Sequence, residues 1–261
     1  MHPRLPDGRH ARRLHLSPVD RYATRNGYRS HMDAADLTFF RVTEDETDLY
    51  VGAARELKDE TLALVREIRA LVKAEIARRP AFLSSLTPIE PKGGEPAPVL
   101  GMYEAAKVAG TGPMAAVAGA VASYVGRGLM SVSPEIIIEN GGDVFVAGMR
   151  RRILSIEAGT SPLTGKNGLR VLPGPGFSVC TSSGTYGHSL SFGRADAAVA
   201  CAENAALADA IATMLGNRCK DETCLAEAVE WAAALPGMTG AAAVIGDKLA
   251  IAGKIELVPL G

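Results

Sequence analysis

The sequence predicts an α+β fold made of duplicated helix-plus-hairpin units, with helices packed on mostly antiparallel sheets. A helix of small residues over 113–125 precedes a strand–turn–strand pattern over 135–148. A second small-residue helix over 204–215 precedes another such pattern over 241–257. Both turns contain Gly-Asp, so the two units repeat a pattern of elements without repeating the residues themselves.

A hairpin is expected before these units. Asn26-Gly27 is a turn signature, and the apolar runs 37–42 and 48–53 flank the polar turn TEDET. Two short apolar runs around a polar turn are typical of paired antiparallel strands. We therefore expect short strands between residues 20 and 52.

A long helix and a proline-rich connection follow. Leu, Ile and Val recur at helical spacing over about 56–79, and Pro80 ends this helix. Residues 84–101 contain four prolines and no periodicity, so we expect a connection there. We divide the chain into a flexible N-terminal tail, 1–20, and one domain, 21–261, built from two intertwined halves.

Composition and charge narrow the class of protein. The chain has 261 residues, of which 47% are hydrophobic, enough to bury a core. A net charge of −1 gives no electrostatic case for nucleic-acid binding. The N-terminus is too polar for a signal peptide, and no apolar run suits a membrane span. We expect a cytoplasmic protein without membrane contact, and a homodimer is one option for its assembly.

The N-terminal arginines and the cysteines are interpreted separately. The first thirty residues contain seven arginines and only two aspartates. They form either a solvated tail or a segment from which one or two arginines fold back onto an anionic ligand. The cysteines are too few for a disulfide framework. Cys219 and Cys224 could form a metal-binding pair, but no second ligand pair is near in sequence, so we expect free thiols.

The run GTGPMAAVAGA at 110–120 is the first candidate site. Gly110 and Gly112 lie before or at a helix start, and Pro113 suits the first helical position. The free N–H groups of a helix N-terminus attract anions, and small residues let a phosphate or a flat ring approach. Close helix packing explains the same residues, so both interpretations stay open.

The turn Asn140-Gly141-Gly142-Asp143 is the second candidate. These residues favour a plain hairpin, because they tolerate a positive φ. Alternatively, the bare amides of the turn bind an anion while Asp143 receives a ribose hydroxyl or an ion.

The helix ENAALADAIATMLGN at 203–217 is the third candidate. Asp209 and Thr213 are four residues apart and share a face of a helix that is otherwise apolar. A buried carboxylate needs compensation. Two hard oxygen donors one turn apart suit Mg²⁺, although a salt bridge or a solvent-facing Asp209 would also satisfy the pattern.

The order of these pieces resembles the ApbE-like family of flavin transferases. That family carries a GGD turn, a TSG segment and an A-D-A-x-x-T helix; this chain has NGGD, then TSSG with a following histidine, then ADAIAT. The likeness covers about residues 105–217 and points to a shorter, cytoplasmic branch. Family members bind FAD, hydrolyse it with Mg²⁺ and transfer FMN to a threonine of an acceptor protein.

The resemblance implies a set of site residues. Asp209 and Thr213 would be Mg²⁺ ligands, and a backbone carbonyl near Ala115 would complete the protein's share. His188, in the hydroxyl-rich run 179–193, is the candidate proton acceptor, because a pKa near neutrality suits that role. The flavin nucleotide would be lined by Asn140, Gly141, Gly142 and Asp143, with Thr181, Ser182, Ser183 and Gly184 beside it.

Two departures from the family bear on activity. The helix after Pro113 lacks the family's Lys-Gly, and His188 is not followed by the family's Asp-Pro-x-Thr-Gly. Three hypotheses follow: a Mg²⁺-dependent enzyme acting on FAD, a non-catalytic flavin or nucleotide carrier, or an enzyme for another phosphorylated metabolite. The departures favour the last two, and Asp209 with Thr213 favours the first.

Overall fold

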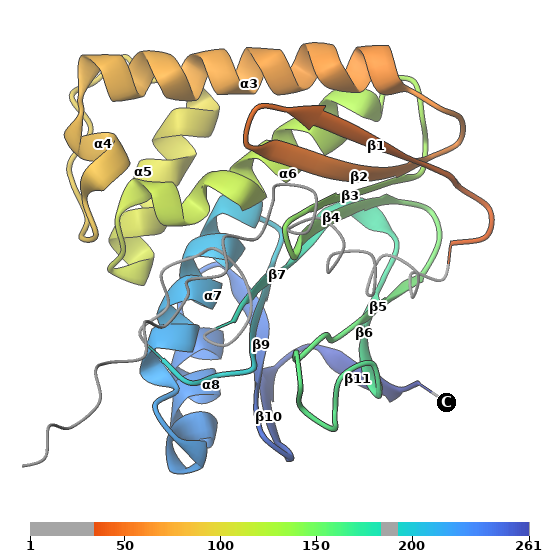
Figure 1. Ribbon diagram of the computed structural model, residues 1–261, viewed down its shortest axis with the longest axis vertical. Helices are drawn as coiled ribbons and strands as arrows, with labels where there is room; N and C mark the ends of the chain where they lie inside the picture. Colours follow the sequence, from red (N-terminus) through yellow and green to blue (C-terminus); the bar gives the residue numbers. More distant parts are fainter. Residues whose placement is uncertain (1–33, 184–192, 261) are drawn as a thin grey trace, which may run out of the picture.

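The core of the protein is a large antiparallel sheet, seen in a computed structural model that describes residues 34–183 and 193–260 (Figure 1). Within these residues the sheet has eight strands in the order β1-β2-β3-β4-β7-β8-β9-β10, and a smaller sheet has the order β11-β6-β5. The strands are β1 (Thr38–Glu44), β2 (Thr47–Ala53), β3 (Ile136–Asn140), β4 (Asp143–Gly148), β5 (Arg152–Ser155), β6 (Asn167–Val171), β7 (Gly174–Ser182), β8 (Ala197–Ala202), β9 (Met238–Ile245), β10 (Lys248–Gly253) and β11 (Glu256–Pro259).

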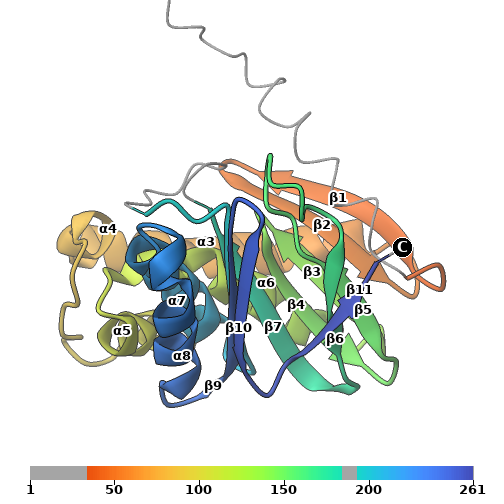
Figure 2. The same cartoon turned by 90° about the horizontal axis from the view of Figure 1, so that it is seen from below.

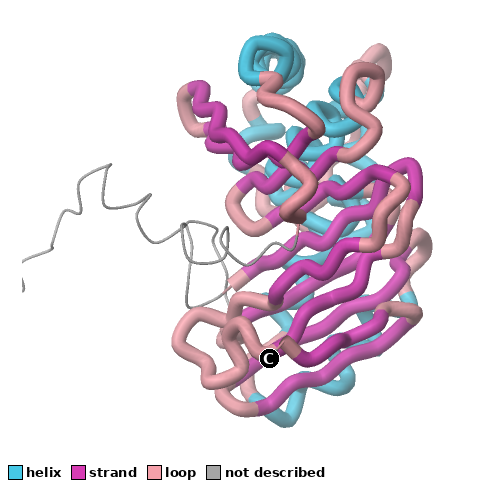
Figure 3. The backbone as a smooth tube through the Cα atoms, turned by 90° about the vertical axis from the view of Figure 1, so that its right-hand side faces the viewer, coloured by secondary structure: helices cyan, strands magenta, loops and turns pink. Residues whose placement is uncertain are grey.

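The helices cover one face of the large sheet, and the small sheet lies on the other face (Figures 2 and 3). Across the described residues no single helix is long and apolar enough to cross a membrane; α5 with η1 and α6 meets that test only as a pair bent by 107°. The helices are α3 (Lys58–Arg78), α4 (Ala81–Ser84), α5 (Ala97–Ala109), α6 (Val117–Leu129), α7 (Ala205–Arg218) and α8 (Leu225–Ala234), with 3₁₀ helices η1 (Pro113–Ala116) and η2 (Glu222–Cys224).

Two hydrophobic cores hold these layers together. One lies between the helices and the large sheet, and the other lies between the two sheets. Every residue of β8, AAVACA, is buried, because α7 covers one of its faces and the second core covers the other. Its small side chains allow α7 to pack close to the sheet.

The predicted α+β fold class is confirmed. The hairpin expected from 37–42 and 48–53 forms as β1 and β2, and the long helix forms as α3, which ends at Arg78 before Pro80. The first helix-plus-hairpin unit forms from η1, α6, β3 and β4, and both of these strands are buried on both faces. The turn signature Asn26-Gly27 lies outside the described residues.

Three details differ from the prediction. The connection over 84–101 is too long, because α5 begins at Ala97 with Pro98 in its first turn, where proline is tolerated. Helix α8 separates α7 from the second hairpin, which the sequence patterns did not reveal. The end of the 241–257 unit belongs to the small sheet, because Gly253 turns the chain away from β10 with φ of +89°.

Candidate functional site

Two buried carboxylates lie near each other, one on the large sheet and one on a helix that covers it. Asp143 is the first residue of β4, Asp209 lies in the middle of α7, and their side chains are only 6% and 9% exposed. Burial raises the pKa of Asp143 to about 7, and the nearby charge of Glu139 adds to the effect. Burial, followed by the charge of Asp143, raises the pKa of Asp209 well above its ordinary value. Because burial disfavours the charged form of both acids, a proton or a nearby cation would stabilise them.

Asp209 caps the N-terminus of α6. Its Oδ2 accepts the N–H of Gly119 at 2.8 Å, and the amide of Ala118 also lowers its pKa. These are amides of the first turn of α6, where a helix favours negative charge. The sequence predicted that the free N–H groups at this helix N-terminus attract an anion. The Asp209 carboxylate already binds part of them.

Close packing within the protein accounts for two of the small residues in the 110–120 run. A Cβ added to Gly119 would lie 2.4 Å from the carbonyl oxygen of Ala205, at the start of α7. A Cβ added to Gly112 would lie 1.7 Å from the carbonyl oxygen of Ser85. Gly110 differs: it is exposed and ends α5 with φ of +77°. The packing interpretation thus explains Gly112 and Gly119, and a ligand contact at Gly110 stays a prediction.

The Asn140–Asp143 turn is a tight hairpin fastened to α6. Gly141 and Gly142 have φ of 69° and 108°, values that favour glycine. The Asn140 side chain donates to the carbonyl of Ala118 at 3.1 Å, and the N–H of Gly142 donates to Glu139 Oε1 at 3.0 Å. The amide of Gly142 is therefore occupied, while Gly141 is the exposed glycine of the turn.

The end of β7 lies beside Asp143. The N–H of Thr181 donates to Asp143 Oδ1 at 3.2 Å, which ties the strand to the first carboxylate. Ser182 is 7% exposed, and its Oγ has no hydrogen-bond partner among the described residues. Ser183 is half-buried. A buried hydroxyl without a partner is rare, and it is a polar group to which a ligand can bind.

The remaining predicted residues lie around this centre. Thr213 lies one turn beyond Asp209 on α7 and is half-buried. The neighbouring Met214 brings its Cε to 3.7 Å from the Cβ position of Gly110. Ala115, in η1, is half-buried and donates its N–H to the carbonyl of Gly112 at 3.1 Å. Gly184 and His188 lie outside the described residues.

The carboxylate pair fits a divalent cation. The groups that shift the pKa values of Asp143 and Asp209 include no Lys or Arg among the described residues. In this part of the chain no set of three His, Cys, Asp or Glu side chains could hold a metal, so the side chains supply two carboxylates at most. Mg²⁺ accepts such a site, because it binds one or two carboxylates and completes its shell with water or phosphate oxygens.

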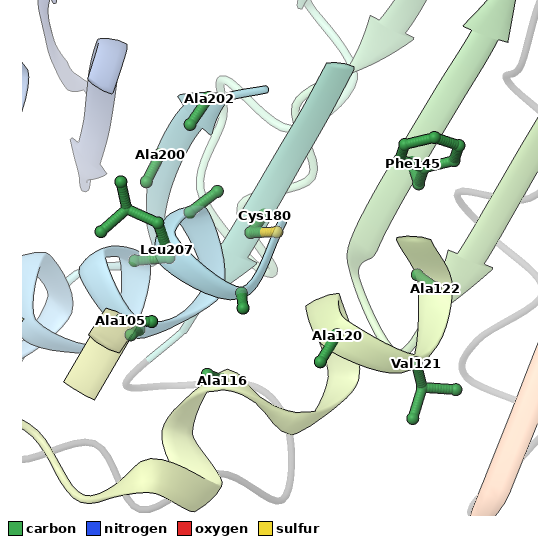
Figure 4. Packing of buried hydrophobic residues seen from close by; sticks show 14 of the residues in the cluster. Ala105, Ala116, Ala120, Val121, Ala122, Phe145, Cys180, Ala200, Ala202 and Leu207 are labelled. Carbon is green, nitrogen blue, oxygen red and sulfur yellow. The ribbon is translucent and has the colours of Figure 1, made fainter. Parts of the chain in front are cut away.

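Cys180 is a buried residue beside Asp143 that the sequence patterns did not single out. Figure 4 shows its side chain between β7 and the beginning of α7, with Ala120 of α6 nearby. It is buried in β7 and interacts with the Asp143 carboxylate, although the sequence alone gave it no role beyond a free thiol. The alternation in FSVCTS could have revealed it, because Ser178, Cys180 and Ser182 fall on one face of a strand. All four cysteines are free, as expected.

Comparison with known proteins defines the class of fold. The structure matches that of the flavin transferase ApbE from Vibrio cholerae with a TM-score of 0.58 and 11% identity, covering 85% of this chain and 98% of that one. The chain therefore has the fold of an ApbE flavin transferase.

Sequence comparison gives the family. A family model described as "AbpE bacteria" matches residues 29–247, so the chain belongs to this family. It is 38% identical over 215 residues to a UPF0280 protein from Methanocella arvoryzae, covering 82% of this chain and 87% of the relative. A UPF0280 protein from Methanocaldococcus jannaschii is 37% identical over 202 residues, covering 75% and 82%. The resemblance inferred from NGGD, TSSG and ADAIAT is confirmed.

Proposed function

We propose that the protein binds a flavin nucleotide, FAD or FMN, through a Mg²⁺ ion held at Asp143 and Asp209. One observation carries this proposal: two carboxylates are buried close enough that the charge of Asp143 raises the pKa of Asp209, and no cationic side chain contributes to their pKa shifts within the described residues. Burying such a pair is unfavourable unless a cation or a proton neutralises it. The fold shared with a flavin transferase favours a nucleotide as the source of the remaining oxygen ligands.

The surrounding residues would hold the cation and the nucleotide. The Thr213 hydroxyl and the carbonyl of Ala115 are the further oxygen donors we assign to the cation. Gly141, with Ser182 and Ser183, offers polar atoms at the edge of the same region. The bond from Asn140 to Ala118 fixes the turn against α6, so the glycines keep their place beside the carboxylates. When bound, Mg²⁺ would neutralise charge on the phosphates.

FMN transfer is the reaction that this site would support if it is catalytic. The acceptor hydroxyl oxygen bonds to the FMN phosphorus, the bond from phosphorus to the AMP oxygen breaks, and the acceptor proton moves to a base. His188 is our candidate for that base. The acceptor must lie in line with the leaving AMP, and cationic groups must surround the phosphates. Because the chain lacks the family's Lys-Gly and Asp-Pro-x-Thr-Gly, we expect slow or no transfer to a family-type acceptor peptide.

A non-catalytic carrier is the second candidate function. The same missing elements favour it, since binding needs the cation and the glycine turn but does not need the transfer machinery. An enzyme for another phosphorylated metabolite would use the same cation and phosphate contacts. Such an enzyme would convert its substrate into product, whereas a carrier would only bind its ligand.

Calorimetry tests the binding proposal. FAD, FMN and ADP are each titrated into the protein with Mg²⁺ and with EDTA, and we expect binding that depends on Mg²⁺. Asp209→Asn should abolish the Mg²⁺ dependence. Asp247→Asn changes the aspartate of the second Gly-Asp turn, which is 67% exposed, and should leave binding unchanged. Absence of heat with all three nucleotides in Mg²⁺ would refute the proposal.

Mass spectrometry separates the enzyme from the carrier. The protein is incubated with FAD, Mg²⁺ and an acceptor peptide, and the peptide mass is examined for added FMN. Rapid stoichiometric labelling that Asp209→Asn abolishes would establish transfer and overturn our expectation of slow chemistry. Tight FAD binding with neither labelling nor released AMP would identify a carrier.

A further inference from the structure

Strand β10 is the last strand of the large sheet, and among the described residues it pairs with β9 alone (Figure 1). Edge strands present unpaired N–H and C=O groups, which proteins usually protect with charged residues, proline or a bulge. The sequence of β10 is KLAIAG, and its single charged residue, Lys248, is at the first position. The side chain of Ile251, in the middle of the strand, is 41% exposed. β10 is therefore an apolar edge that is open to pairing.

The other edges of the two sheets carry the protection that β10 lacks. β1 contains Arg41 and Glu44, and each of these side chains binds an oppositely charged residue. In the small sheet, β5 begins at Arg152 and β11 ends at Pro259. The contrast singles out β10 as the edge suited to contact another strand.

The backbone of β10 leaves alternate residues free to bond outward. Lys254, directly after the strand, donates its N–H to the carbonyl of Thr239 at 2.7 Å, so the even-numbered residues bond toward β9. In an antiparallel ladder these residues alternate with residues whose N–H and C=O point away. The N–H and C=O groups of Leu249 and Ile251 therefore point out of the sheet.

We propose that β10 is a dimer interface, in which it pairs antiparallel with β10 of a second copy of this chain about a two-fold axis at Ala250. Leu249 then lies opposite Ile251 of the second copy, and these two residues exchange hydrogen bonds through their outward groups. Such an interface is self-complementary, as two-fold symmetry requires. The two large sheets become one continuous sheet.

Charge complementarity favours this partner and this register. Here Lys254 lies opposite Gly246 of the second copy, and Glu222 Oε1 lies 3.7 Å from the Cβ position of Gly246. Both charged side chains are exposed, and the ion pairs of the described residues use neither of them. Each copy therefore offers a free cation to a free carboxylate of the other. Moving the axis by one residue would instead place Lys248 opposite Lys254, which is unfavourable.

The helix layer leaves room for the pairing. α8 contacts both β9 and β10, so it lies over the last two strands. Since paired strands lie about 4.8 Å apart, the two copies of α8 would lie about 10 Å apart. That is the ordinary separation of packed helices.

Sedimentation velocity tests the interface. The wild type should sediment as a dimer, and Ile251→Lys should sediment as a monomer because it places a charge in the middle of the pairing. Thr43→Lys is the matched control, since it adds the same charge at an exposed position of the other edge strand, β1. Lys254→Glu should weaken the dimer about tenfold, and adding Glu222→Lys should restore it to within about threefold. Urea unfolding checks that each variant folds.

Cross-linking tests the register without disturbing the strand. Ala250 should face its own counterpart at about 4.5 Å between Cα atoms, a distance that a disulfide can span. In a Cys224→Ser background, where the remaining cysteines are buried, Ala250→Cys should give a covalent dimer on oxidation with copper phenanthroline. Ala252→Cys should not, because its counterpart lies four residues away along the strand, about 13 Å.

A wild type that is monomeric at every concentration overturns the inference. So does a dimer that Ile251→Lys leaves intact, because it must use another surface. Cross-linking through Ala252→Cys and not through Ala250→Cys overturns the register and the charge pairing with it. None of these outcomes depends on nucleotide or Mg²⁺, so the interface and the proposed function stand or fall separately.

Discussion

Removing the charge of Asp143 should stabilise the metal-free protein at neutral and alkaline pH. Burial raises the pKa of this carboxyl from 3.8 to about 7. A carboxyl with a raised folded-state pKa contributes stability that is fully present below its unfolded pKa, near 4, and is lost as the pH rises through about 7. At about 1.4 kcal/mol per pKa unit, the ionised Asp143 destabilises the folded state by about 4 kcal/mol at about pH 8.

Asp143→Asn makes this effect measurable. Asparagine has nearly the same shape, and its side-chain oxygen can still accept the N–H of Thr181. Urea unfolding in EDTA can be followed through Trp231, the sole tryptophan, which packs 4.2 Å from the Arg218 guanidinium. At about pH 8 the variant should be more stable than wild type by up to about 4 kcal/mol, and by only about 1.5 kcal/mol at about pH 5.

With Mg²⁺ present, the wild type should become more stable than Asp143→Asn. A cation that binds only the folded state stabilises it by mass action, and the wild type alone retains both carboxylates. The increment from Mg²⁺ should therefore grow with pH up to about 8 in the wild type and be small in Asp143→Asn. Asp247→Asn should follow the wild type throughout. If Asp143→Asn is less stable than wild type at about pH 8 in EDTA, the carboxylate is not an uncompensated buried charge and the reasoning fails.

Three further predictions concern residues that stabilise the fold. Gly119→Ala should destabilise the protein by about 1–3 kcal/mol in urea unfolding, because its Cβ would meet α7, whereas Gly101→Ala on α5 has open space and should be neutral or stabilising. Asp36→Asn should cost up to about 2 kcal/mol at neutral pH, because Arg152 lowers the Asp36 pKa to about 2; this difference should vanish as pH falls from about 4 to 2, and a pH-independent loss would contradict it. Asn204→Ala should cost about 1 kcal/mol by removing the N-cap of α7, a loss that thermal unfolding would show.

The parts of the fold that the sequence predicted are those with a strong local pattern. The spacing of apolar residues identified α3, and the polar turns between apolar runs identified the β1–β2 and β3–β4 hairpins. Helix α5 was missed because Pro98 looked like a break, although proline fits a first helical turn. The small sheet could not be foreseen, since β11 pairs with β6 across more than eighty residues of sequence.

The sequence predicted individual residues of the candidate site but not which of them lie close together in the fold. Four-residue spacing placed Asp209 and Thr213 on one helix face. The nearness of Asp209 to Asp143 depends on how α7 packs against β4 and β7 of the sheet, which no local pattern encodes. Contacts between segments distant in the sequence also explain Gly112, which packs against Ser85, and Gly119, which packs against Ala205.

The hydrogen bonds of the two carboxylates indicate how many ligand positions they can fill. A carboxylate has about four lone-pair sites. Asp209 uses one of them for the N–H of Gly119, and Asp143 uses one for the N–H of Thr181. Each carboxylate thus keeps at least one site with which it could hold the proposed Mg²⁺ ion. Thr213, a backbone carbonyl, water and phosphate would supply the other oxygens. If the proposed site holds Mg²⁺, phosphate would bind it without displacing either aspartate, so nucleotide and cation should each raise the other's affinity by the same factor.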